Sequence, residues 1–260
     1  MVLPILYMFF SAFKPMDELF AYPPRFITTR PTFINFRKLL AATGTTNTPV
    51  TVYLFNSIVI SIIVMVLTIL FGTSAAYTLS KRQFRGKGLL FKINTLTLMF
   101  VPTTVSIPRY IVISKLGLLD NFWSQILPLL AMPVGLFLLK QFIDQLPDAV
   151  IEAARIDGAT EYGILFRIVI PMIRPAVSTV AMLVFQNVWT NVEASRNYIN
   201  RESLKTFAFY MSALTSSTGN SVAGQGMAAA ASLIMFVPVF LLFIIMQSRV
   251  MNTMSYSGIK

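Results

Sequence analysis

The sequence predicts an all-α, polytopic membrane protein. Of its 260 residues, 55% are hydrophobic and only 12% are charged, whereas a soluble domain carries about 25% charged residues. The mean hydropathy is +0.70, and long stretches without any charge alternate with charged segments. Such stretches are typical of transmembrane helices, because the hydrocarbon core of a bilayer disfavours charged side chains.

Five stretches without charge are long enough to cross a hydrocarbon core of about 30 Å, which takes about 20 helical residues. A sixth stretch, at the N-terminus, reaches Lys14 after only a dozen apolar residues. We expect it to be the outer half of a first span that is truncated in this chain; a signal peptide and an interfacial segment are the alternatives. The expected spans within one transmembrane permease domain, 1–260, are residues 1–13 (partial), 53–79, 89–109, 122–139, 175–192 and 226–248.

Positive charge gathers between the second and third expected spans. Residues 81–92 contain five Lys and Arg and no acidic residue, directly beside two spans, where the positive-inside rule has most force. We therefore expect this segment, the segment 140–174 and both chain termini to be cytoplasmic (N-in, C-in). The formal net charge is +11. We assign this excess of Lys and Arg to segments beside the membrane. The chain has no stripe of Lys and Arg interleaved with aromatic residues, which binding along a nucleic acid would need.

The composition excludes most catalytic chemistry. The chain has no Cys and no His, which removes thiolate and His-assisted nucleophiles and the usual zinc ligands. The glycine-rich segment 219–226 lacks the Gly-Lys-Ser/Thr of a phosphate-binding loop, so we expect no catalytic residue, no metal site and no ATP bound by this chain. An ion-coupled secondary transporter is the alternative function, although the intramembrane carboxylate or His that it would need is missing from the five long spans.

Residues 140–174, between the fourth and fifth expected spans, have the pattern of a helix-turn-helix outside the bilayer. Pro147 is suited to the start of a helix, and Gly158 is suited to end it, because glycine tolerates a positive φ. Thr160 is expected to cap a second helix, which Pro171 and Pro175 end before the next span begins. A helical hairpin of this kind either packs on its own protein or docks into a groove on another, and both readings stay open at this point.

The hairpin also carries a string of residues at fixed spacing. They are Glu152, Ala153, Ala154, Asp157, Gly158, Ala159, Phe166, Ile170, Pro171 and Pro175. In this register they resemble the EAA signature loop of the permease subunits of type I ABC importers. Further strings resemble the MalG-like permeases of carbohydrate uptake: Ser11–Pro15, Asn56–Ser57, Ser74–Tyr77 and Phe84–Lys87. One departure is Trp189–Glu193, where that family usually reads W-N-D or W-N-E.

The resemblance implies a multi-pass, non-catalytic subunit of a bacterial or archaeal cell (inner) membrane that imports a sugar or oligosaccharide. It implies a second permease, related but not identical, so that the pair is a heterodimer surrounded by membrane lipid. It also implies an extracytoplasmic solute-binding protein and two ABC ATPase subunits, which bind ATP and Mg. The hairpin would then be a coupling helix pair seated in the ATPase, with Glu152 facing a basic residue there and Gly158 making the bend. The tail 252–260 would also reach the ATPases.

Polar residues in the expected spans are candidates for the substrate pathway. Asn56, Asn187 and Asn191 carry amides that are costly in hydrocarbon unless they meet a partner such as a sugar hydroxyl. Hydrogen bonds between helices are the alternative for all three. Arg109 is expected at the outer interface, where it either snorkels or attracts an acidic sugar together with Lys115.

We also predict the contacts of two further segments. The small residues of 224–231 are expected to pack closely against a partner subunit. The segment 193–221 is expected either to contact the solute receptor or to be a disordered loop.

Overall fold

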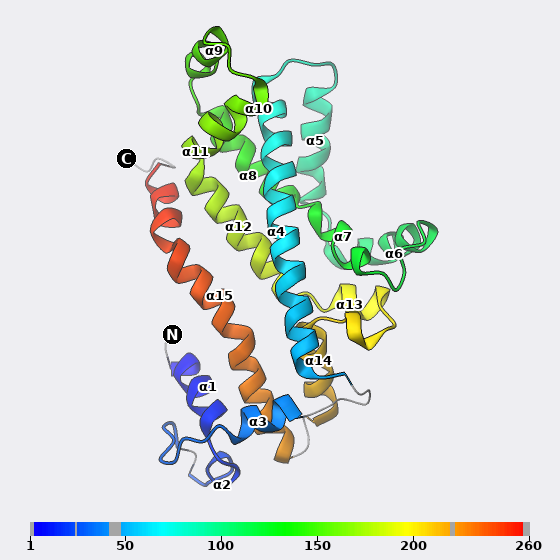
Figure 1. Ribbon diagram of the computed structural model, residues 1–260, viewed down its shortest axis with the longest axis vertical. Helices are drawn as coiled ribbons and strands as arrows, with labels where there is room; N and C mark the ends of the chain where they lie inside the picture. The colour runs from blue at the N-terminus through cyan, green and yellow to red at the C-terminus, as the bar shows by residue number, and fades with distance from the viewer. Residues whose placement is uncertain (1–2, 24, 42–47, 219–221, 257–260) are drawn as a thin grey trace. The chain divides into compact units, whose positions relative to one another are not determined.

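The computed structural model describes residues 3–23, 25–41, 48–218 and 222–256, and this part of the chain is helical and contains no strand (Figure 1). The all-α prediction is therefore confirmed for the described residues. The chain divides into two compact units, and two long helices, α4 (Val50–Lys81) and α15 (Val222–Tyr256), contribute residues to both. The first unit is Met1–Ile60, Leu116–Gln125 and Trp189–Leu241, and the second is Ser61–Lys115, Ile126–Val188 and Leu242–Lys260.

The first unit packs short helices against the N-terminal part of α4 and most of α15. Its core consists of aromatic and aliphatic side chains and two alanines. The ring centroids of Tyr53 and Tyr210 lie 5.2 Å apart in this core. The buried core residues are Leu39, Val50, Tyr53, Phe207, Tyr210, Leu214, Ala230 and Ala231. The other elements of this unit are α1 (Leu3–Phe13), α2 (Met16–Leu19), α3 (Ile34–Ala41), η2 (Phe122–Gln125), α13 (Glu193–Tyr198), η4 (Glu202–Leu204) and α14 (Phe207–Thr218).

The small residues of α15 pack inside this unit. Ala230 and Ala231 are fully buried in its core, and a Cβ added to Gly226 would lie within van der Waals radii of the Asn35 amide, the nearest approach of any described glycine. Small side chains let two helices approach closely, and here they bring α15 against α3 of the same chain. At these positions, packing within the chain takes the place of the predicted contact of 224–231 with a partner subunit.

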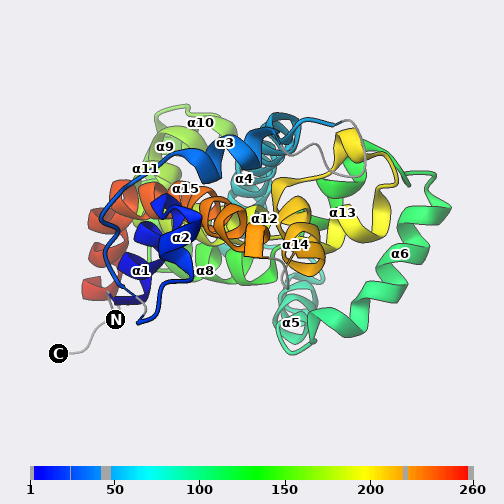
Figure 2. The same ribbon diagram turned by 90° about the horizontal axis from the view of Figure 1, so that it is seen from below.

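The second unit combines the rest of α4 and the end of α15 with shorter helices. In both Figure 1 and Figure 2, α6 lies to one side of this unit, away from α12. The elements are α5 (Lys87–Thr97), η1 (Pro102–Val105), α6 (Ser106–Lys115), α7 (Leu127–Leu130), α8 (Pro133–Asp144), α9 (Asp148–Ile156), α10 (Glu161–Ile164), the π-helical turn η3 (Leu165–Val169), α11 (Ile170–Met172) and α12 (Arg174–Trp189).

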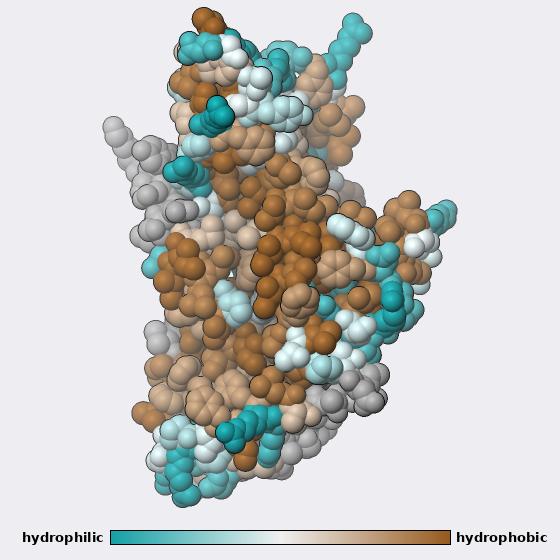
Figure 3. All heavy atoms as spheres, in the orientation of Figure 1, coloured by the Kyte–Doolittle hydropathy of each residue, from teal (hydrophilic) through white to brown (hydrophobic). Residues whose placement is uncertain are grey.

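Among the described residues, two helices are long and apolar enough to cross a membrane by themselves, Val50–Lys81 and Gly224–Gln247. Helices α4 and α15 contain the expected spans 53–79 and 226–248. Hydrophobic side chains cover the visible side of α4 (Figure 3), as expected of a surface that faces lipid. The N-terminal helix α1 is apolar but has only 11 residues, and residues 1–2 of its expected span lie outside the described residues.

Two expected spans are interrupted. Helix α5 ends at Thr97 and α6 begins at Ser106, so residues 89–109 do not form one helix, and Arg109 does not continue the helix that contains Leu89. Proline causes this break, because Pro102 lacks an N–H and disfavours a helical conformation at Val101, which is extended at φ −74° and ψ 129°.

The expected span 122–139 is likewise bent, by 43°, between α7 and α8. Pro133 opens α8, and Ala131 and Met132 before it leave the helical region. The expected span 175–192 also ends early, because α12 ends at Trp189. The two breaks at Pro102 and Pro133 are not evident from the length of the charge-free stretches.

The segment 193–221 is folded over its described residues, 193–218, which form α13, η4 and α14. The disordered-loop alternative is therefore wrong for this part. Its remaining three residues lie outside the described ranges.

Candidate functional site

The hairpin of residues 148–172 begins with the predicted helix and turn. Helix α9 runs from Asp148 to Ile156 with Pro147 before it, and Gly158 adopts a φ of +81°. The N–H of Gly158 donates to the carbonyl of Arg155 at 3.0 Å, and that of Ala159 donates to the carbonyl of Ala154 at 2.9 Å. This pair of bonds is a Schellman motif, which ends a helix with glycine in the left-handed region, so the predicted stop at Gly158 is confirmed.

The second half of the hairpin starts and ends as predicted. The hydroxyl of Thr160 accepts the N–H of Gly163 at 3.2 Å and caps α10. A π-helical turn at Leu165–Val169 precedes Pro171, and the helix ends at Met172, between Pro171 and Pro175. A widened turn there relieves the clash that proline makes with the carbonyl four residues earlier. An 85° bend then separates this helix from α12.

Large apolar side chains are exposed on the hairpin. Ile156 is 87% exposed and Tyr162 is 78% exposed, while Phe166 and Val150 are partly exposed. We call Val150, Ile156, Tyr162 and Phe166 the hairpin surface. The predicted motif residues Glu152, Ala153, Asp157, Gly158 and Ala159 are exposed around it, whereas Ala154 is buried and Pro171 is half-buried. The motif therefore contains some residues that shape the hairpin and others that are exposed on its surface, where a second protein can contact them.

Glu161 joins the hairpin to the end of α4, beside which α10 lies (Figure 1). Its carboxylate accepts hydrogen bonds from Oη of Tyr77 at 2.8 Å and from Nε of Arg155 at 3.1 Å. Nη2 of Arg82 lies 2.5 Å from the same carboxylate. Burial by itself raises the pKa of Glu161, but the hydrogen bonds from Tyr77 and Arg155 and the charge of Arg82 outweigh it and hold the pKa below its ordinary value.

Lys81, the last residue of α4, makes a second attachment. Its Nζ donates to the carbonyl of Leu146 at 2.6 Å and to the carboxylate of Asp148 at 2.7 Å. The hydrogen bond and the charge of Lys81 hold the pKa of Asp148 below its ordinary value. One residue earlier, the hydroxyl of Ser80 donates to Asp144 at the end of α8. Through these contacts the end of α4, the end of α8 and both helices of the hairpin are connected.

Sequence reasoning does not identify these attachments. It places Glu161 only in the first turn of a helix, and Tyr77 only within a resemblance. A signal is nevertheless present: residues 81–92 hold excess positive charge, and acidic residues of the segment 140–174, which is predicted to lie on the same side of the membrane, are its natural partners.

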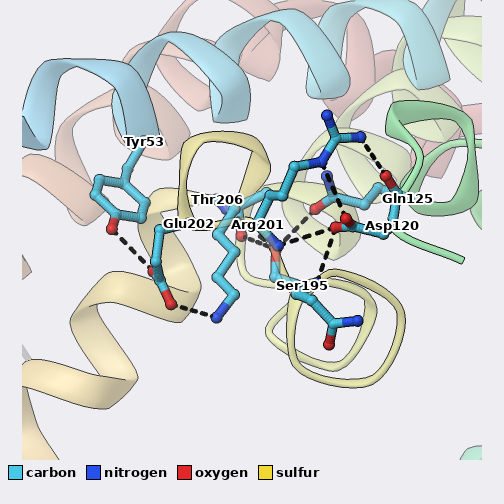
Figure 4. A network of polar contacts seen from close by, with 9 residues as sticks. Tyr53, Asp120, Gln125, Ser195, Arg201, Glu202 and Thr206 are labelled. Atoms are coloured by element: carbon cyan, nitrogen blue, oxygen red, sulfur yellow. Dashed lines mark hydrogen bonds and ion pairs between the residues drawn. The ribbon is translucent and has the colours of Figure 1, made fainter. Parts of the chain in front are cut away.

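A second polar cluster lies in the first unit and is centred on Asp120 (Figure 4). One carboxylate oxygen accepts the backbone N–H groups of Asn200 and Arg201 at 3.0 and 2.9 Å, and the other accepts Nε of Arg201 at 3.0 Å. Nη2 of Arg201 also donates to the Asp120 carbonyl at 2.6 Å. The backbone N–H of Arg201 is the main cause that lowers the pKa of Asp120. We call this cluster, with the buried residues described next, the polar clamp.

The buried part of the polar clamp is built around Gln125, which is 1% exposed. Its Nε2 donates to the carbonyl of Leu204 at 2.8 Å, and its Oε1 accepts the hydroxyl of Ser195 at 2.7 Å. The Ser195 hydroxyl in turn accepts the N–H of Thr206 at 3.0 Å. These bonds join the segment 116–125 to residues about 80 positions later in the chain.

The polar clamp extends to α4 through Glu202. Oη of Tyr53 donates to Glu202 at 3.0 Å, and Nζ of Lys205 lies 2.5 Å from the same carboxylate (Figure 4). No feature of the sequence indicates that Tyr53 and Glu202 meet.

The predicted pathway residues have the following positions. Nδ2 of Asn56 donates to the carbonyls of Ser203 and Lys205 at 2.8 and 3.0 Å. Oδ1 of Asn191 accepts the N–H of Ala194, in the first turn of α13, at 2.9 Å. Asn187 is exposed on α12, and Arg109 is half-buried on α6. Asn56 and Asn191 therefore bond backbone groups of their own unit, while the role of all four in substrate transport stays a prediction.

Comparison with known proteins gives consistent matches along the whole chain. Residues 1–250 match the model of the family described as "Binding-protein-dependent transport system inner membrane component". The arabinooligosaccharides transport system permease protein AraQ of Halalkalibacterium halodurans is 29% identical over 100% of this chain and 91% of its own. The sulfoquinovosyl glycerol transport system permease protein SmoH of Agrobacterium fabrum is 27% identical over 99% of this chain and 88% of its own.

A solved structure shares the fold. It is described as a bacterial ABC transporter involved in the import of the acidic polysaccharide alginate, and the matching chain superposes with a TM-score of 0.81 at 21% sequence identity. The match covers 95% of this chain and 90% of that chain.

Proposed function

The chain belongs to the family of binding-protein-dependent transport system inner membrane components, and from this premise we propose that it is the permease subunit of an ATP-driven ABC importer for a sugar or oligosaccharide. It is a transport subunit of the membrane and not itself an enzyme. The relatives named above transport arabinooligosaccharides and sulfoquinovosyl glycerol, which supports a carbohydrate cargo. The ion-coupled alternative has no support from these matches.

We propose that the hairpin surface is the docking site for a cytoplasmic ATPase subunit, and this surface is the main support for the proposed function. A side chain such as Ile156 or Tyr162 that is mostly exposed in this chain gains about 1.5–3 kcal/mol when a partner buries it fully. Glu152 stands beside this surface and is exposed, so that it can pair with a basic residue of the ATPase. Hot spots of interfaces typically combine such apolar anchors with a few charged residues around them.

The attachments of the hairpin to α4 provide the mechanical connection. When the ATPase subunits move on binding and hydrolysing ATP, a hairpin held by Glu161 and Lys81 moves α4 with it instead of bending at its base. A rigid-body movement needs contacts of this kind at its fixed points. The Schellman turn at Gly158 keeps the two halves of the hairpin at a constant angle.

The rest of the assembly follows from the proposed function. We place six spans in the membrane with both termini inside, and a related, non-identical permease beside this one. An extracytoplasmic solute-binding protein delivers the sugar, and two ATPase subunits bind ATP and Mg. The tail 252–260 is proposed to contact the ATPases; residues 257–260 lie outside the described residues.

The proposal is tested by co-purification. The chain is expressed with its partner subunits, and Ile156→Glu is compared with Tyr22→Glu, which changes a side chain that is 96% exposed elsewhere. We expect the ATPase subunit to co-purify with the wild type and with Tyr22→Glu, but with Ile156→Glu in much lower yield. If no ATPase subunit accompanies the wild-type chain, the proposed function is wrong.

A further inference from the structure

Residues 20–23 and 25–33, between α2 and α3 of the first unit, expose large apolar side chains in a segment that is not helical. We call this segment the aromatic loop. Tyr22 is 96% exposed, Phe26 and Ile27 are each 63% exposed, and Phe33 is 67% exposed. An exposed apolar patch of this kind marks a surface that contacts another molecule or a membrane.

The aromatic loop folds back along α1. The ring of Phe26 meets that of Tyr7 edge to face, with 5.9 Å between the ring centroids. Tyr7 lies six residues before Phe13, the last residue of α1, which is about 9 Å along a helix that rises 1.5 Å per residue. The chain therefore leaves α1 at Phe13 and returns beside an earlier turn of the same helix.

Lys14 fixes this return. It is only 2% exposed, and its Nζ donates to the carbonyl of Arg25. The same Nζ lies 5.0 Å from the centroid of the Tyr7 ring, and a cation over an aromatic face is attracted by it. Lys14 thus holds the residue before Phe26 against the ring that Phe26 contacts.

The second half of the loop is tied to α2 and to the end of α1. The carboxylate of Glu18 accepts the hydroxyl of Thr28 at 2.7 Å, the N–H of Thr29 at 3.1 Å and the hydroxyl of Thr29. The N–H of Thr32 donates to the carbonyl of Phe13 at 2.8 Å. Because these polar groups bond to the two helices, the large apolar side chains of the loop remain on its outside.

The charged residues of the loop are all basic. Arg25 and Arg30 are exposed, and the sequence has no acidic residue from position 19 to position 41. Arg37 and Lys38 of α3 add two further exposed cations. Large apolar side chains beside long cationic ones suit the membrane interface, where the cations reach the phosphate groups of phospholipids.

The position of the loop favours the membrane over a protein partner. A solute receptor would approach the end of α1, whereas Phe26 lies beside an earlier turn of this helix. Helix α1 itself exposes Leu6 and Phe9, as a surface that faces acyl chains does. A non-helical backbone is not exposed to lipid within the hydrocarbon core, so the loop belongs at the boundary between head groups and acyl chains.

We propose that the aromatic loop is an interfacial membrane anchor, in which Phe26 and Ile27 enter the head-group boundary of the outer leaflet and Arg25 and Arg30 face phospholipid phosphates. The inference goes beyond the proposed function. It takes from it only that the C-terminal end of α1 lies on the outer side of the membrane.

A spin label at a single cysteine tests this placement, since the chain has no cysteine of its own. Phe26→Cys and Ile27→Cys are each labelled with a methanethiosulfonate spin label in the complete complex, with cysteine-free partner subunits. The complexes are then reconstituted in phosphatidylethanolamine and phosphatidylglycerol. Collisions of the label with oxygen, which concentrates among acyl chains, are compared with collisions with nickel ethylenediaminediacetate, which stays in water. The references are Asp17→Cys, at an exposed residue of α2, and Val66→Cys, at an exposed residue in the middle of α4.

We expect both loop labels to give a ratio of oxygen to nickel collisions between those of Asp17→Cys and Val66→Cys. Addition of the solute receptor should leave this ratio unchanged. A ratio equal to that of Asp17→Cys would place the loop in water and overturn the inference. Shielding of both loop labels from both reagents would show that another protein covers the loop, and a ratio that changes with the receptor would assign the loop to the receptor. Both results contradict a membrane anchor.

The same samples separate this inference from the proposed function. If the complex hydrolyses ATP while the loop labels lie in water, the anchor alone is wrong. If no ATPase subunit accompanies the chain but the loop labels give the intermediate ratio, the proposed function is wrong and the anchor stands.

A second pair of variants tests how the loop is held. Glu18→Ala removes the acceptor shared by Thr28 and Thr29, and Asp17→Ala removes an exposed carboxylate from the same helix. Each is combined with the labelled Phe26→Cys. We expect Glu18→Ala to shift the collision ratio toward water and Asp17→Ala to leave it unchanged. An unchanged ratio in Glu18→Ala would exclude Glu18 as the residue that positions the loop.

Discussion

The hairpin of the second unit and the polar clamp of the first unit use their side chains differently. The hairpin exposes the large apolar side chains Ile156 and Tyr162 and places its ion pairs at its base, where Glu161 and Lys81 connect it to α4. The polar clamp instead buries Gln125 and Ser195, which bond each other and the backbone of a distant segment. An element with exposed apolar groups and a fixed base is suited to hold another molecule. An element with buried, satisfied polar groups is suited to hold its own chain.

The largest expected effect comes from the turn of the hairpin. No described atom lies within 4 Å of a Cβ added to Gly158, so a substitution there acts through the backbone alone. Left-handed φ costs other residues roughly 1–2 kcal/mol, and Asn less than most. We expect receptor-stimulated ATP hydrolysis to fall in the order wild type, Gly158→Asn, Gly158→Val, and to be lost in Gly158→Pro.

The control for this series is Gly88→Asn and Gly88→Val, because Gly88 also has open space around it and no positive φ is recorded for it. These variants should hydrolyse ATP like the wild type. Equal activity of Gly158→Val and wild type would show that the angle of the hairpin does not matter for coupling.

The next effect concerns the base of the hairpin. Glu161→Ala removes the acceptor shared by Tyr77, Arg82 and Arg155 but leaves the hairpin surface in place. We expect ATP hydrolysis to persist while the number of sugars imported per ATP falls by about fivefold, the low end of typical coupling free energies. Sugar uptake and phosphate release are measured together in proteoliposomes. Asp17→Ala, at an acidic residue outside the hairpin, should leave the ratio unchanged, and an unchanged ratio in Glu161→Ala would refute the role of this attachment.

The pH dependence of this ratio has a defined sign. The pKa of Glu161 is lowered in the folded protein, so its contribution is present above the ordinary pKa of a glutamate and is lost only as the pH falls through the lowered value. The wild-type ratio should therefore stay constant from neutral pH down to the ordinary glutamate pKa. Glu161→Gln should show a lower ratio that does not change over this range. A wild-type ratio that already falls near neutral pH would contradict the assignment.

The polar clamp is expected to affect stability rather than coupling. Gln125→Leu removes the bond to the Ser195 hydroxyl, which keeps its contacts with Thr206, and leaves the Leu204 carbonyl without its donor. An unsatisfied buried group of this kind costs about 1–3 kcal/mol. We expect a lower free energy of unfolding and an unchanged ratio of sugar to ATP. Gln83→Leu, at an exposed glutamine, is the control. If Gln125→Leu instead lowered the ratio at wild-type stability, the distinction between the two regions would fail.

The smallest effect is expected at Arg109. A solvent-accessible charge pair contributes about 0.2–1 kcal/mol, so Arg109→Leu should reduce uptake of a uronate oligosaccharide by up to about fivefold and leave a neutral oligosaccharide unaffected. Competition between the two sugars in one uptake assay gives the preference directly. An unchanged preference would leave snorkelling as the role of Arg109.

The hairpin is predictable because its determinants are local. Pro147, Gly158 and Thr160 each act on backbone groups within a few residues, so the sequence around them is sufficient. The polar clamp is not predictable, because Asp120 and Arg201 are 81 residues apart and neither is unusual in its own segment. The broken helices lie between these cases: Pro102 and Pro133 are visible in the sequence, but charge-free length measures hydrophobicity and does not detect a break in a helix.

The most direct test of the central claim, that the hairpin docks on the ATPase, is a photo-cross-link from a single cysteine. Tyr162→Cys is labelled with benzophenone maleimide before the ATPase subunits are added, and Tyr22→Cys, at another highly exposed tyrosine, serves as the control. The account predicts that illumination joins the labelled Tyr162→Cys chain to an ATPase subunit and that Tyr22→Cys gives no such product. A cross-link from Tyr162→Cys only to lipid or to the second permease, with the ATPase bound and active, would contradict it.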